Sequence, residues 1–445
     1  MYDWNPAYKW LIDIKNEYIG RFGREGLYNA GGFRSFVNKW VSALYGHEES
    51  SDNMRLLRCL IVNTTGTVVN LHYNTIAVSK ICKSVFPEKG AYEAYTALWD
   101  FKGGFLQKCR SVCIDAEHEE IVIAAYDKFF NINEMPWTQL DEVKNEMSGE
   151  MEKAEADRVL ELSDKLDGSF MAASWHYGQG AVGISSSGDY NSPDNKHIGI
   201  AKEYIDSNIM SMITENKDLT FMFELLDSRI PIVIRYPESM RGLHLIGIRD
   251  KNTGETYLYK QTAEFARLYG ARHVPVTDMA DINELVERAA KISGVEGWVL
   301  NIGGRRYKLK SRDYLNIAHI MTGDVVGANV IKCYCENTAD DFVSRLPQDI
   351  AEEFFEKLEM VKQYEETMLQ KLETCYKNAD KSSRAAFAKW CVNEGMSGLA
   401  LMNMFKMFEG KEPHVLYAEI GKERKYIKFE EVERLAAVQT ADSEL

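Results

Sequence analysis

Residues 165–169 read Lys-Leu-Asp-Gly-Ser and combine a lysine with a short acidic, glycine-containing turn. A lysine amine can attack the α-phosphorus of a nucleotide and hold the nucleotide as a phosphoramidate. The turn would fix the backbone of Lys165 beside a sheet. A K-x-D-G match alone is weak evidence, since ordinary residue usage gives one by chance in roughly one of ten chains of this length. The alternative is an exposed turn before a strand.

Two glutamates further along the chain occupy positions where a carboxylate needs a partner. Glu224 lies in the apolar run FMFELL, and burying a carboxylate without a partner is costly. A ribose hydroxyl or a metal-bound water would be a suitable partner. Glu296 directly precedes the apolar run GWVL. The alternatives are a strand-edge glutamate in a salt bridge for Glu224, and a helix-end or turn residue for Glu296.

A concentrated basic segment follows in a chain whose formal net charge is −14. Five of the eight residues 305–312 are basic. Because successive side chains of a strand alternate faces, Arg306, Lys308, Lys310 and Arg312 would line one face. A solvated face would more often mix charges of both signs. Since phosphate groups favour basic surfaces, this row is the candidate groove for a polyanion in an acidic protein.

These residues fit nucleotidyl transfer. A free lysine has a pKa of about 10.4, so its amine is protonated at neutral pH. We expect nearby cations to lower the pKa of Lys165 and expose its lone pair. The same cations would neutralise the charge of departing pyrophosphate. The carboxylates would anchor a divalent metal. Because magnesium gives up its water ligands reluctantly, we expect them to hold it through those waters.

Short strands and interspersed helices must position these residues. We expect strands in residues 109–130, 169–188, 219–226, 233–237, 243–250, 297–304 and 305–311, and helices at Lys260–Tyr269 and Asp281–Ile292. Residues 169–188 form a hairpin that turns near Gly178–Gly180. This pattern favours an α+β fold built on antiparallel sheets.

The length of 445 residues predicts two or three domains. Residues 1–90 form a mixed N-terminal extension, with helical spacing from Trp10 to Tyr18 and one or two strands in residues 55–74. Residues 91–330 form the strand-rich domain. Residues 331–445 are predicted to be a separate helical domain, because apolar residues recur every three or four positions.

Several other classes of function are disfavoured. The glycines at 178, 180 and 183 match a dinucleotide fingerprint but lie between two expected strands rather than before a helix. No Walker-type phosphate-binding motif occurs. The nine histidines form no metal-ligand cluster, and the eight cysteines lack zinc-site spacing, so we expect structural histidines and reduced thiols. The chain lacks a signal-peptide pattern and an apolar run of roughly 18 residues, which favours a soluble, intracellular protein.

The motifs together resemble those of the covalent nucleotidyltransferase superfamily of ligases and capping enzymes. KLDGS resembles its nucleophile motif, FELL its third motif, EGWV its fourth and YKLK its fifth, in matching order and spacing. The chain is most similar to the RNA ligase 1 family of T-even-like phages. CRSVCID followed by DKFFNINEMPWT, within residues 109–138, resembles the N-terminal signature of that family.

The resemblance implies an α+β, antiparallel-sheet nucleotidyltransferase (ATP-grasp-like ligase) domain with a helical C-terminal domain. Residues 91–330 would be the adenylyltransferase domain. Lys165 would be the adenylated nucleophile, Glu224 would contact the ribose or a metal-bound water, and Glu296 would help to hold the catalytic metal. Lys308 and Lys310 would contact the ATP phosphates.

Five further residues would belong to the ATP site by the same resemblance. Asp167 and Gly168 form part of the nucleotide-binding motif. Tyr314 falls where the family has a functional tyrosine, and Arg110 and Lys128 would orient the β- and γ-phosphates. The chain departs from the family where the serine-rich run 185–188 replaces a lysine, and where its first 90 residues exceed the usual length.

The implied activity is ATP-dependent RNA ligation through lysyl-AMP and RNA-adenylate intermediates, with Mg²⁺ or Mn²⁺. The partners would be RNA ends bearing a 5′-phosphate and a 3′-hydroxyl, with nicked tRNA as one candidate, in cytoplasmic RNA repair (host cytoplasm for a phage protein). Alternatives are a DNA ligase or capping-type enzyme, which would need an OB-fold domain, and a non-catalytic nucleotide- or RNA-binding module. The complete set of lysines and glutamates argues against the binding module.

Overall fold

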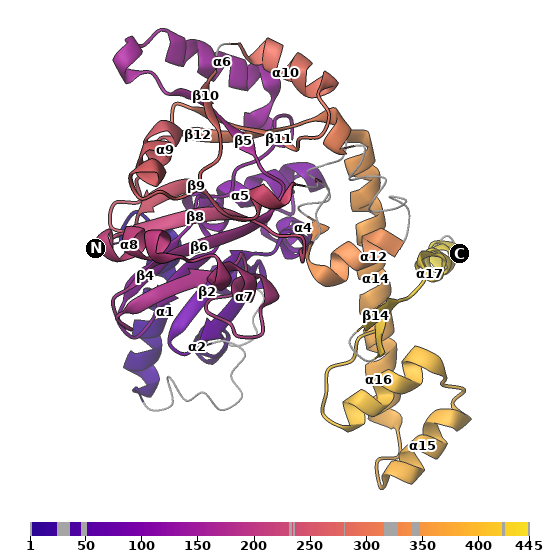
Figure 1. Cartoon of the computed structure of the whole chain (residues 1–445). Coiled ribbons are helices and arrows are strands. Elements are labelled where there is room, and N and C mark those ends of the chain that lie inside the picture. The colour runs from indigo at the N-terminus through magenta and orange to yellow at the C-terminus, as the bar shows by residue number, and fades with distance from the viewer. Residues whose placement is uncertain are drawn as a thin grey trace. The chain divides into compact units, whose positions relative to one another are not determined.

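The computed structural model describes residues 2–24, 36–45, 51–230, 234, 236–279, 281–315, 328–339, 348–420 and 423–443. The chain divides into two compact units, Met1–Ile317 and Ala318–Leu445 (Figure 1). Among the described helices, none combines the length and apolarity needed to cross a membrane. Of the expected strand at 233–237, residues 233 and 235 lie outside the described residues, and Ile234, Tyr236 and Pro237 are not in a strand.

The N-terminal part of the first unit is a four-stranded antiparallel sheet, here called sheet A, with five helices. Its strands follow the order β1(Leu60–Thr65), β2(Val68–Tyr73), β3(Val112–Asp115) and β4(Glu120–Ala124). The helices are α1(Pro6–Phe22), α2(Phe36–Tyr45), α3(Asp52–Arg58), α4(Thr75–Val85) and α5(Ala91–Lys108). An aromatic-rich core that includes Trp40, Trp99 and Phe105 joins them.

This arrangement bears on the expected extension at residues 1–90. Strand β2 pairs directly with β3, with Val68 opposite Asp115. A boundary at residue 90 would therefore separate two hydrogen-bonded strands of one sheet and divide one hydrophobic core. The division does not coincide with a break in the fold, because β1 and β2 complete the sheet that β3 and β4 begin.

A second sheet, sheet C, packs against sheet A. Its strand order is β7(Ala181–Ser185), β6(Ser169–His176), β8(Leu219–Leu226) and β9(Gly242–Asp250). Apolar residues such as Ile123, Ala172 and Met222 fill the contact with sheet A. The other face packs on α7(Lys196–Glu203), α8(Ser207–Glu215) and α9(Tyr259–Leu268). The expected strands FMFELL and LHLIGIRD and the 169–188 hairpin are confirmed here.

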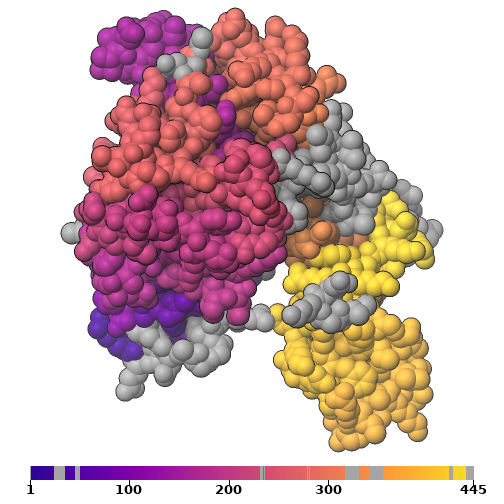
Figure 2. Space-filling view, in the orientation of Figure 1, coloured from indigo at the N-terminus to yellow at the C-terminus, as the bar shows by residue number. Residues whose placement is uncertain are grey.

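A third sheet, sheet B, carries the fourth and fifth motifs. Its order is β10(Val276–Asp278), β5(Leu160–Lys165), β11(Gly297–Ile302) and β12(Arg305–Lys310), and its pairings are antiparallel. Helices α6(Leu140–Met151) and α10(Ile282–Lys291) cover one face (Figure 1). Short 3₁₀ turns occur at Pro136–Thr138, Glu155–Asp157 and Glu238–Met240. In the space-filling view this unit runs from indigo at the N-terminal helices to orange-red near α10 (Figure 2). The α+β, antiparallel-sheet class is confirmed.

The second unit is mainly helical, as expected from its periodicity. It contains α12(Ala328–Glu336), α14(Gln348–Asn378), α15(Arg384–Asn393), α16(Gly398–Phe408), the hairpin β13(Tyr417–Ile420) and β14(Glu423–Tyr426), and α17(Phe429–Ser443). The unit begins at Ala318, so the boundary expected between residues 330 and 331 would cut through α12.

Candidate active site

Three adjoining strands of sheet B bring the first, fourth and fifth motifs to one point. Lys165 at the end of β5 lies opposite Gly297 of β11, and Gly297 lies opposite Lys310 of β12. Glu296 directly precedes Gly297, and its Oε1 lies 2.6 Å from Lys165 Nζ and 3.2 Å from Lys310 Nζ. The side chains of Glu296 and Lys310 are buried, whereas that of Lys165 is 22% exposed. Two ammonium groups therefore share one carboxylate oxygen.

Gly297 is required at the centre of this arrangement. Its φ of 142° lies in a region that L side chains rarely adopt. A Cβ atom at this position would lie 2.1 Å from the carbonyl oxygen of Leu309. The glycine of the EGWV motif thus lets β11 and β12 approach closely enough for Glu296 to meet Lys310.

Glu224 of β8 approaches the lysine from sheet C. It lies opposite Phe170 of β6, and the short connection Leu166–Gly168 joins β5 to β6. Burial raises the pKa of Glu224 to about 8, with Lys165 opposing this shift and Glu296 adding to it. A carboxyl group in this environment needs a cation or a hydrogen-bond donor to stay ionised at neutral pH.

The pKa of Lys165 is raised, which corrects the expectation that cations lower it. Burial alone would lower this pKa, but the carboxylates of Glu296 and Glu224 outweigh burial. The pKa of Glu296 is in turn lowered, because Lys165 and Lys310 together overcome the effect of its burial. The carboxylates therefore stabilise Lys165 as an ammonium. Lys310 does not counter this effect directly, because it is paired with Glu296.

Asp167 fixes the turn that follows the lysine. Its Oδ1 accepts a hydrogen bond from Tyr314 Oη at 3.0 Å, and its Oδ2 accepts one from the backbone N–H of Ile234 at 2.9 Å. Its own backbone N–H donates to Tyr236 Oη at 2.8 Å. Both oxygens of Asp167 are thus bonded within the protein, so the structure supports a positioning role for Asp167 and Tyr314.

The basic row on β12 is only partly as expected. Arg306, Lys308 and Lys310 alternate along the strand, but Arg312 lies beyond its end in an exposed helical turn. The expectation that Arg312 extends the row is wrong, because the strand ends at Lys310. The guanidinium of Arg306 lies 3.7 Å from the ring centre of Tyr126 and donates to Thr256 Oγ1.

Aromatic rings also contact Arg110 and Lys308, two of the cations that the resemblance assigned to phosphates. The guanidinium of Arg110 lies 4.9 Å from the centre of the Phe129 ring and 5.1 Å from that of Phe170. Lys308 Nζ lies 5.1 Å from the same Phe129 ring. Arg110 and Lys308 are therefore brought to one aromatic side chain, beside the strand that carries Glu224.

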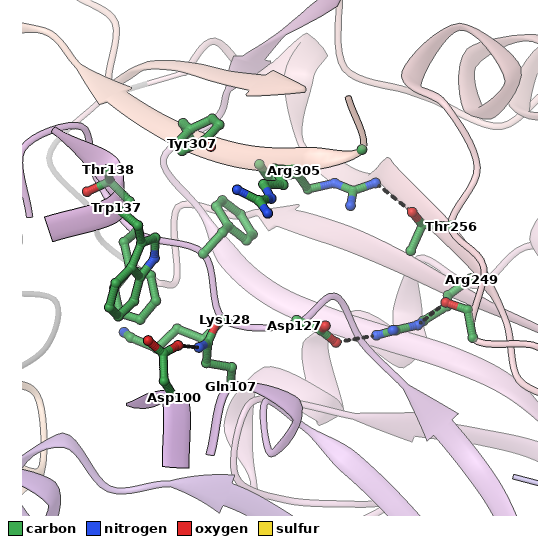
Figure 3. A pocket seen from close by; sticks show the side chains of 15 residues that line it. Asp100, Gln107, Asp127, Lys128, Trp137, Thr138, Arg249, Thr256, Arg305 and Tyr307 are labelled. Carbon is green, nitrogen blue, oxygen red and sulfur yellow. Dashed lines mark hydrogen bonds and ion pairs between the residues drawn. The ribbon is translucent and has the colours of Figure 1, made fainter. Parts of the chain in front are cut away.

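Lys128 is separated from this group by its own aromatic surroundings. It is buried, and its Nζ lies 4.5 Å from the ring centre of Tyr73 and 5.0 Å from those of Trp99 and Phe130. It also lines a cavity of about 570 Å³ (Figure 3). The phosphate-binding role of Lys128 stays a prediction.

The serine-rich run 185–188 lies next to Arg110. Ser111 Oγ lies 2.6 Å from the carbonyl oxygen of Ser186 and 2.7 Å from that of Ser187. One hydroxyl thus holds the run beside the strand that follows Arg110. Although the run lacks the lysine of the resembled family, it is still held to Ser111 by these contacts.

His176 and the glycine pattern occupy structural positions. His176 is fully buried, with Nε2 at 2.8 Å from Asp115 Oδ2 and Nδ1 at 2.9 Å from Tyr190 Oη. Gly178 and Gly180 lie in the β6–β7 turn, as expected. Within the described ranges, no group of three or more His, Cys, Asp or Glu residues could by itself hold a metal ion.

Sequence reasoning missed the residues that orient the charged ones. Phe129 and Phe170 bracket Arg110, and Tyr236 fixes the backbone of Asp167. Phe129 stands in the DKFFN segment, which offered a signal. Phe170 and Tyr236 stand in ordinary strand-like sequence and offered none.

A comparison with known families identifies this region. Residues 108–314 match the sequence model of a family described as RNA ligase. Over this segment, the chain is similar in sequence to the RNA ligase family. The matched segment contains every candidate site residue named above, from Arg110 to Tyr314.

Known proteins similar to the chain include ligases from two organisms. The tRNA ligase 1 of Schizosaccharomyces pombe is 26% identical over 208 residues, which covers 42% of this chain and 25% of that protein. The chain thus matches about a quarter of the length of this curated relative. A Naegleria gruberi RNA ligase variant with ATP and Mn has a TM-score of 0.34 at 14% identity, covering 43% of this chain and 57% of that chain. The same ligase with PPi has a TM-score of 0.31 at 17% identity, covering 39% and 55%.

Proposed function

We propose that the chain is an ATP-dependent RNA ligase that carries AMP on Lys165. The observation that supports this most directly is the pair of distances from Glu296 Oε1 to Lys165 Nζ and Lys310 Nζ, 2.6 and 3.2 Å, inside an RNA ligase segment. A nucleophilic amine, a carboxylate and a second cation are the groups that nucleotidyl transfer needs at one point.

The proposed reaction has three steps. Lys165 Nζ attacks the α-phosphorus of ATP, a P–N bond forms, and the P–O bond to pyrophosphate breaks. An oxygen of the RNA 5′-phosphate then attacks the same phosphorus, which breaks the P–N bond and restores the amine. Finally a 3′-hydroxyl attacks the activated 5′-phosphate, and AMP leaves.

The first step requires Lys165 to lose a proton. Because the surrounding carboxylates raise its pKa, the amine is protonated at neutral pH unless a neighbour accepts that proton. Glu296 lies within hydrogen-bond distance of it. Glu224, whose pKa is raised to about 8, can hold a proton nearby or accept a hydrogen bond from a ribose hydroxyl.

The cations of β12, together with Arg110, would stabilise the leaving pyrophosphate. Lys308 and Lys310 follow each other on one face of the strand, and Arg110 lies against the same phenyl ring as Lys308. Together they would neutralise the charge that develops on pyrophosphate. Lys128 would contribute from the neighbouring cavity.

A divalent cation fits the carboxylates at this point. The Oε2 atom of Glu296 is buried and has no hydrogen-bond partner among the described residues, so it can accept a cation or its water. Glu296 would hold Mg²⁺ or Mn²⁺, with Glu224 close by. Such an ion would supply charge neutralisation on the nucleotide phosphates. With few protein ligands at hand, phosphates and waters would complete its coordination.

The substrates proposed are RNA ends with a 5′-phosphate and a 3′-hydroxyl, in cytoplasmic RNA repair. Nicked tRNA is a candidate, supported by the similarity to a protein named tRNA ligase 1. We assign adenylyl transfer to the strand-rich domain, predicted at residues 91–330. The helical domain, predicted at residues 331–445, would add RNA specificity.

Labelling with [α-³²P]ATP and Mg²⁺, followed by denaturing electrophoresis and intact-mass measurement, tests the proposal. Wild-type protein should gain the mass of one AMP, and Lys165→Ala should reduce labelling at least a thousandfold. Lys291→Ala is the matched control, since Lys291 is an exposed lysine paired with Glu287. Labelled protein should then join 5′-phosphorylated RNA but not 5′-hydroxyl RNA.

Other results would favour the alternatives. Labelling by GTP instead of ATP would indicate a capping-type enzyme. Joining of DNA but not RNA ends would indicate a DNA ligase. A wild-type protein that never acquires label would leave only nucleotide or RNA binding.

A further inference from the structure

The cavity lined by Lys128 has the composition of a nucleotide-binding surface. Its volume of about 570 Å³ lies within the range of small-molecule sites. Four cations and four aromatic side chains line it: Lys128, Arg249, Arg305, Arg306, Phe129, Phe130, Trp137 and Tyr307. Figure 3 shows Trp137 and Lys128 on one side and Arg249 with Thr256 on the other. Proteins bind single-stranded nucleic acid through this combination of aromatic faces and basic groups.

Four cations line the cavity against two carboxylates, those of Asp100 and Asp127, so the lining has an excess of positive charge. Asp127 is paired with Arg249 at 2.8 Å and also with Lys108. Arg305 lies 3.6 Å from Glu146, and its side chain is 73% exposed. Arg306 has a buried Nε without a hydrogen-bond partner among the described residues. An anionic group entering the cavity would therefore meet cations that are not fully compensated.

The cavity adjoins the proposed catalytic residues through Phe129. This ring lines the cavity and also contacts Lys308 and Arg110. Strand β12 gives the same continuity, because Arg306 lies at the cavity and Lys310 at Glu296, with Lys308 between them. Strand β12 thus connects the cavity with the site at Glu296.

The in-line geometry of the second step indicates which RNA strand would enter the cavity. In the second step, the attacking 5′-phosphate oxygen must approach roughly in line with the departing Lys165 nitrogen. That approach is from the side through which pyrophosphate leaves, along Lys310 and Lys308. An RNA strand that enters along these lysines would next reach Arg306 and the cavity, because Lys310, Lys308 and Arg306 follow one another on β12.

We propose that this cavity binds the first nucleotides of the 5′-phosphorylated RNA strand. A base stacks on Trp137, whose ring packs edge-on against Phe130 at 5.7 Å, and Arg305 contacts the following phosphodiester. The proposal rests on the proposed ligase function. It assigns to Trp137 and Arg305 a role in holding RNA, separate from the formation of lysyl-AMP.

Two assays on full-length protein separate these roles. The first measures the rate of AMP labelling with ATP and Mg²⁺ in the absence of RNA. The second isolates AMP-loaded protein and measures a single turnover of AMP transfer to a short 5′-phosphorylated RNA at increasing RNA concentrations. Wild-type protein that fails the first assay would refute the ligase function itself, before any variant is compared.

Arg305→Ala and Trp137→Ala should each raise the RNA concentration for half-maximal transfer at least tenfold. Their labelling rates should change far less, by under threefold. Trp137→Phe, which keeps an aromatic face, should recover most of the loss. Lys291→Ala and Tyr177→Ala serve as matched surface controls, since both residues are exposed and neither lines the cavity.

Three results would overturn the proposal. Equal losses in both assays would assign the cavity to ATP or pyrophosphate. A changed dependence on the 3′-hydroxyl strand, with unchanged AMP transfer, would assign it to the other RNA end. If Arg305→Ala leaves the RNA concentration for half-maximal transfer unchanged, the cavity does not bind the RNA strand. This result would decide the matter even if Trp137→Ala failed to fold.

Discussion

The backbone of Gly168 lies directly against the side chain of Glu224. A Cβ atom on Gly168 would come within 2.6 Å of Glu224 Cγ and 2.7 Å of the carbonyl oxygen of Leu225. The glycine of the first motif thus fits into the strand of the third motif. This contact couples the turn after Lys165 to Glu224, which, after Glu296, is the second carboxyl group that raises the pKa of Lys165.

Gly168→Ala should destabilise the protein and slow AMP labelling, because the added methyl group must displace Glu224 or the β8 backbone. Overpacking of this kind costs about 1–3 kcal/mol. Denaturant unfolding and the labelling rate measure the two effects. Gly149→Ala is the control, since its Cβ would meet nothing within 4 Å and it lies inside α6. A Gly168→Ala protein of wild-type stability and labelling rate would contradict the close packing.

The labelling rate should rise with pH in the alkaline range, because only the unprotonated amine of Lys165 attacks ATP. Glu296 is the nearest carboxylate and raises the pKa of Lys165. Glu296→Gln should therefore shift the rising limb to lower pH, although the maximal rate should fall. Rates of labelling between pH 6 and 10 measure the shift. A limb that stays in place, or moves to higher pH, would show that Glu296 does not govern this proton.

The free energy of unfolding of the wild-type protein, relative to that of Glu224→Gln, should fall as the pH rises from about 4.5 to 8. The pKa of Glu224 is raised to about 8 in the folded state, so the folded state binds more protons than the unfolded state in this window. The difference should grow by at most about 1.4 kcal/mol per pH unit. Urea unfolding at several pH values measures it. The exposed Glu142→Gln serves as control, and parallel curves for wild type and Glu224→Gln would count against a raised pKa.

Asp167 and Tyr314 should be energetically coupled through their 3.0 Å hydrogen bond. Tyr314→Phe should cost about 1 kcal/mol, and Asp167→Ala about 1–3 kcal/mol, because it also leaves the Ile234 N–H without its acceptor. The double variant should cost less than the sum, with a coupling of about 0.5 kcal/mol or more. Unfolding free energies of the four proteins complete the cycle. Strict additivity would mean that the bond adds nothing to stability.

Much of the fold could be predicted from local patterns. The short, mostly apolar runs FMFELL, LHLIGIRD and GWVL predicted β8, β9 and β11, and apolar spacing predicted α14. The helices α9 and α10 were also expected. The role of residues 1–90 could not be predicted, because pairing of β2 with β3 joins segments separated by α4 and α5. Such long-range pairing depends on tertiary packing rather than on the local sequence.

The residue types and their order determined which groups could do chemistry: a lysine before a tight turn, two glutamates at strand positions and a basic strand. The tertiary structure decided which of them meet. It placed Glu296 between Lys165 and Lys310, and so reversed the expected direction of the lysine pKa shift. It also left Arg312 beyond the strand end. The physical reason is that electrostatic effects depend on separation and burial, which strand register fixes and which spacing along the chain does not reveal.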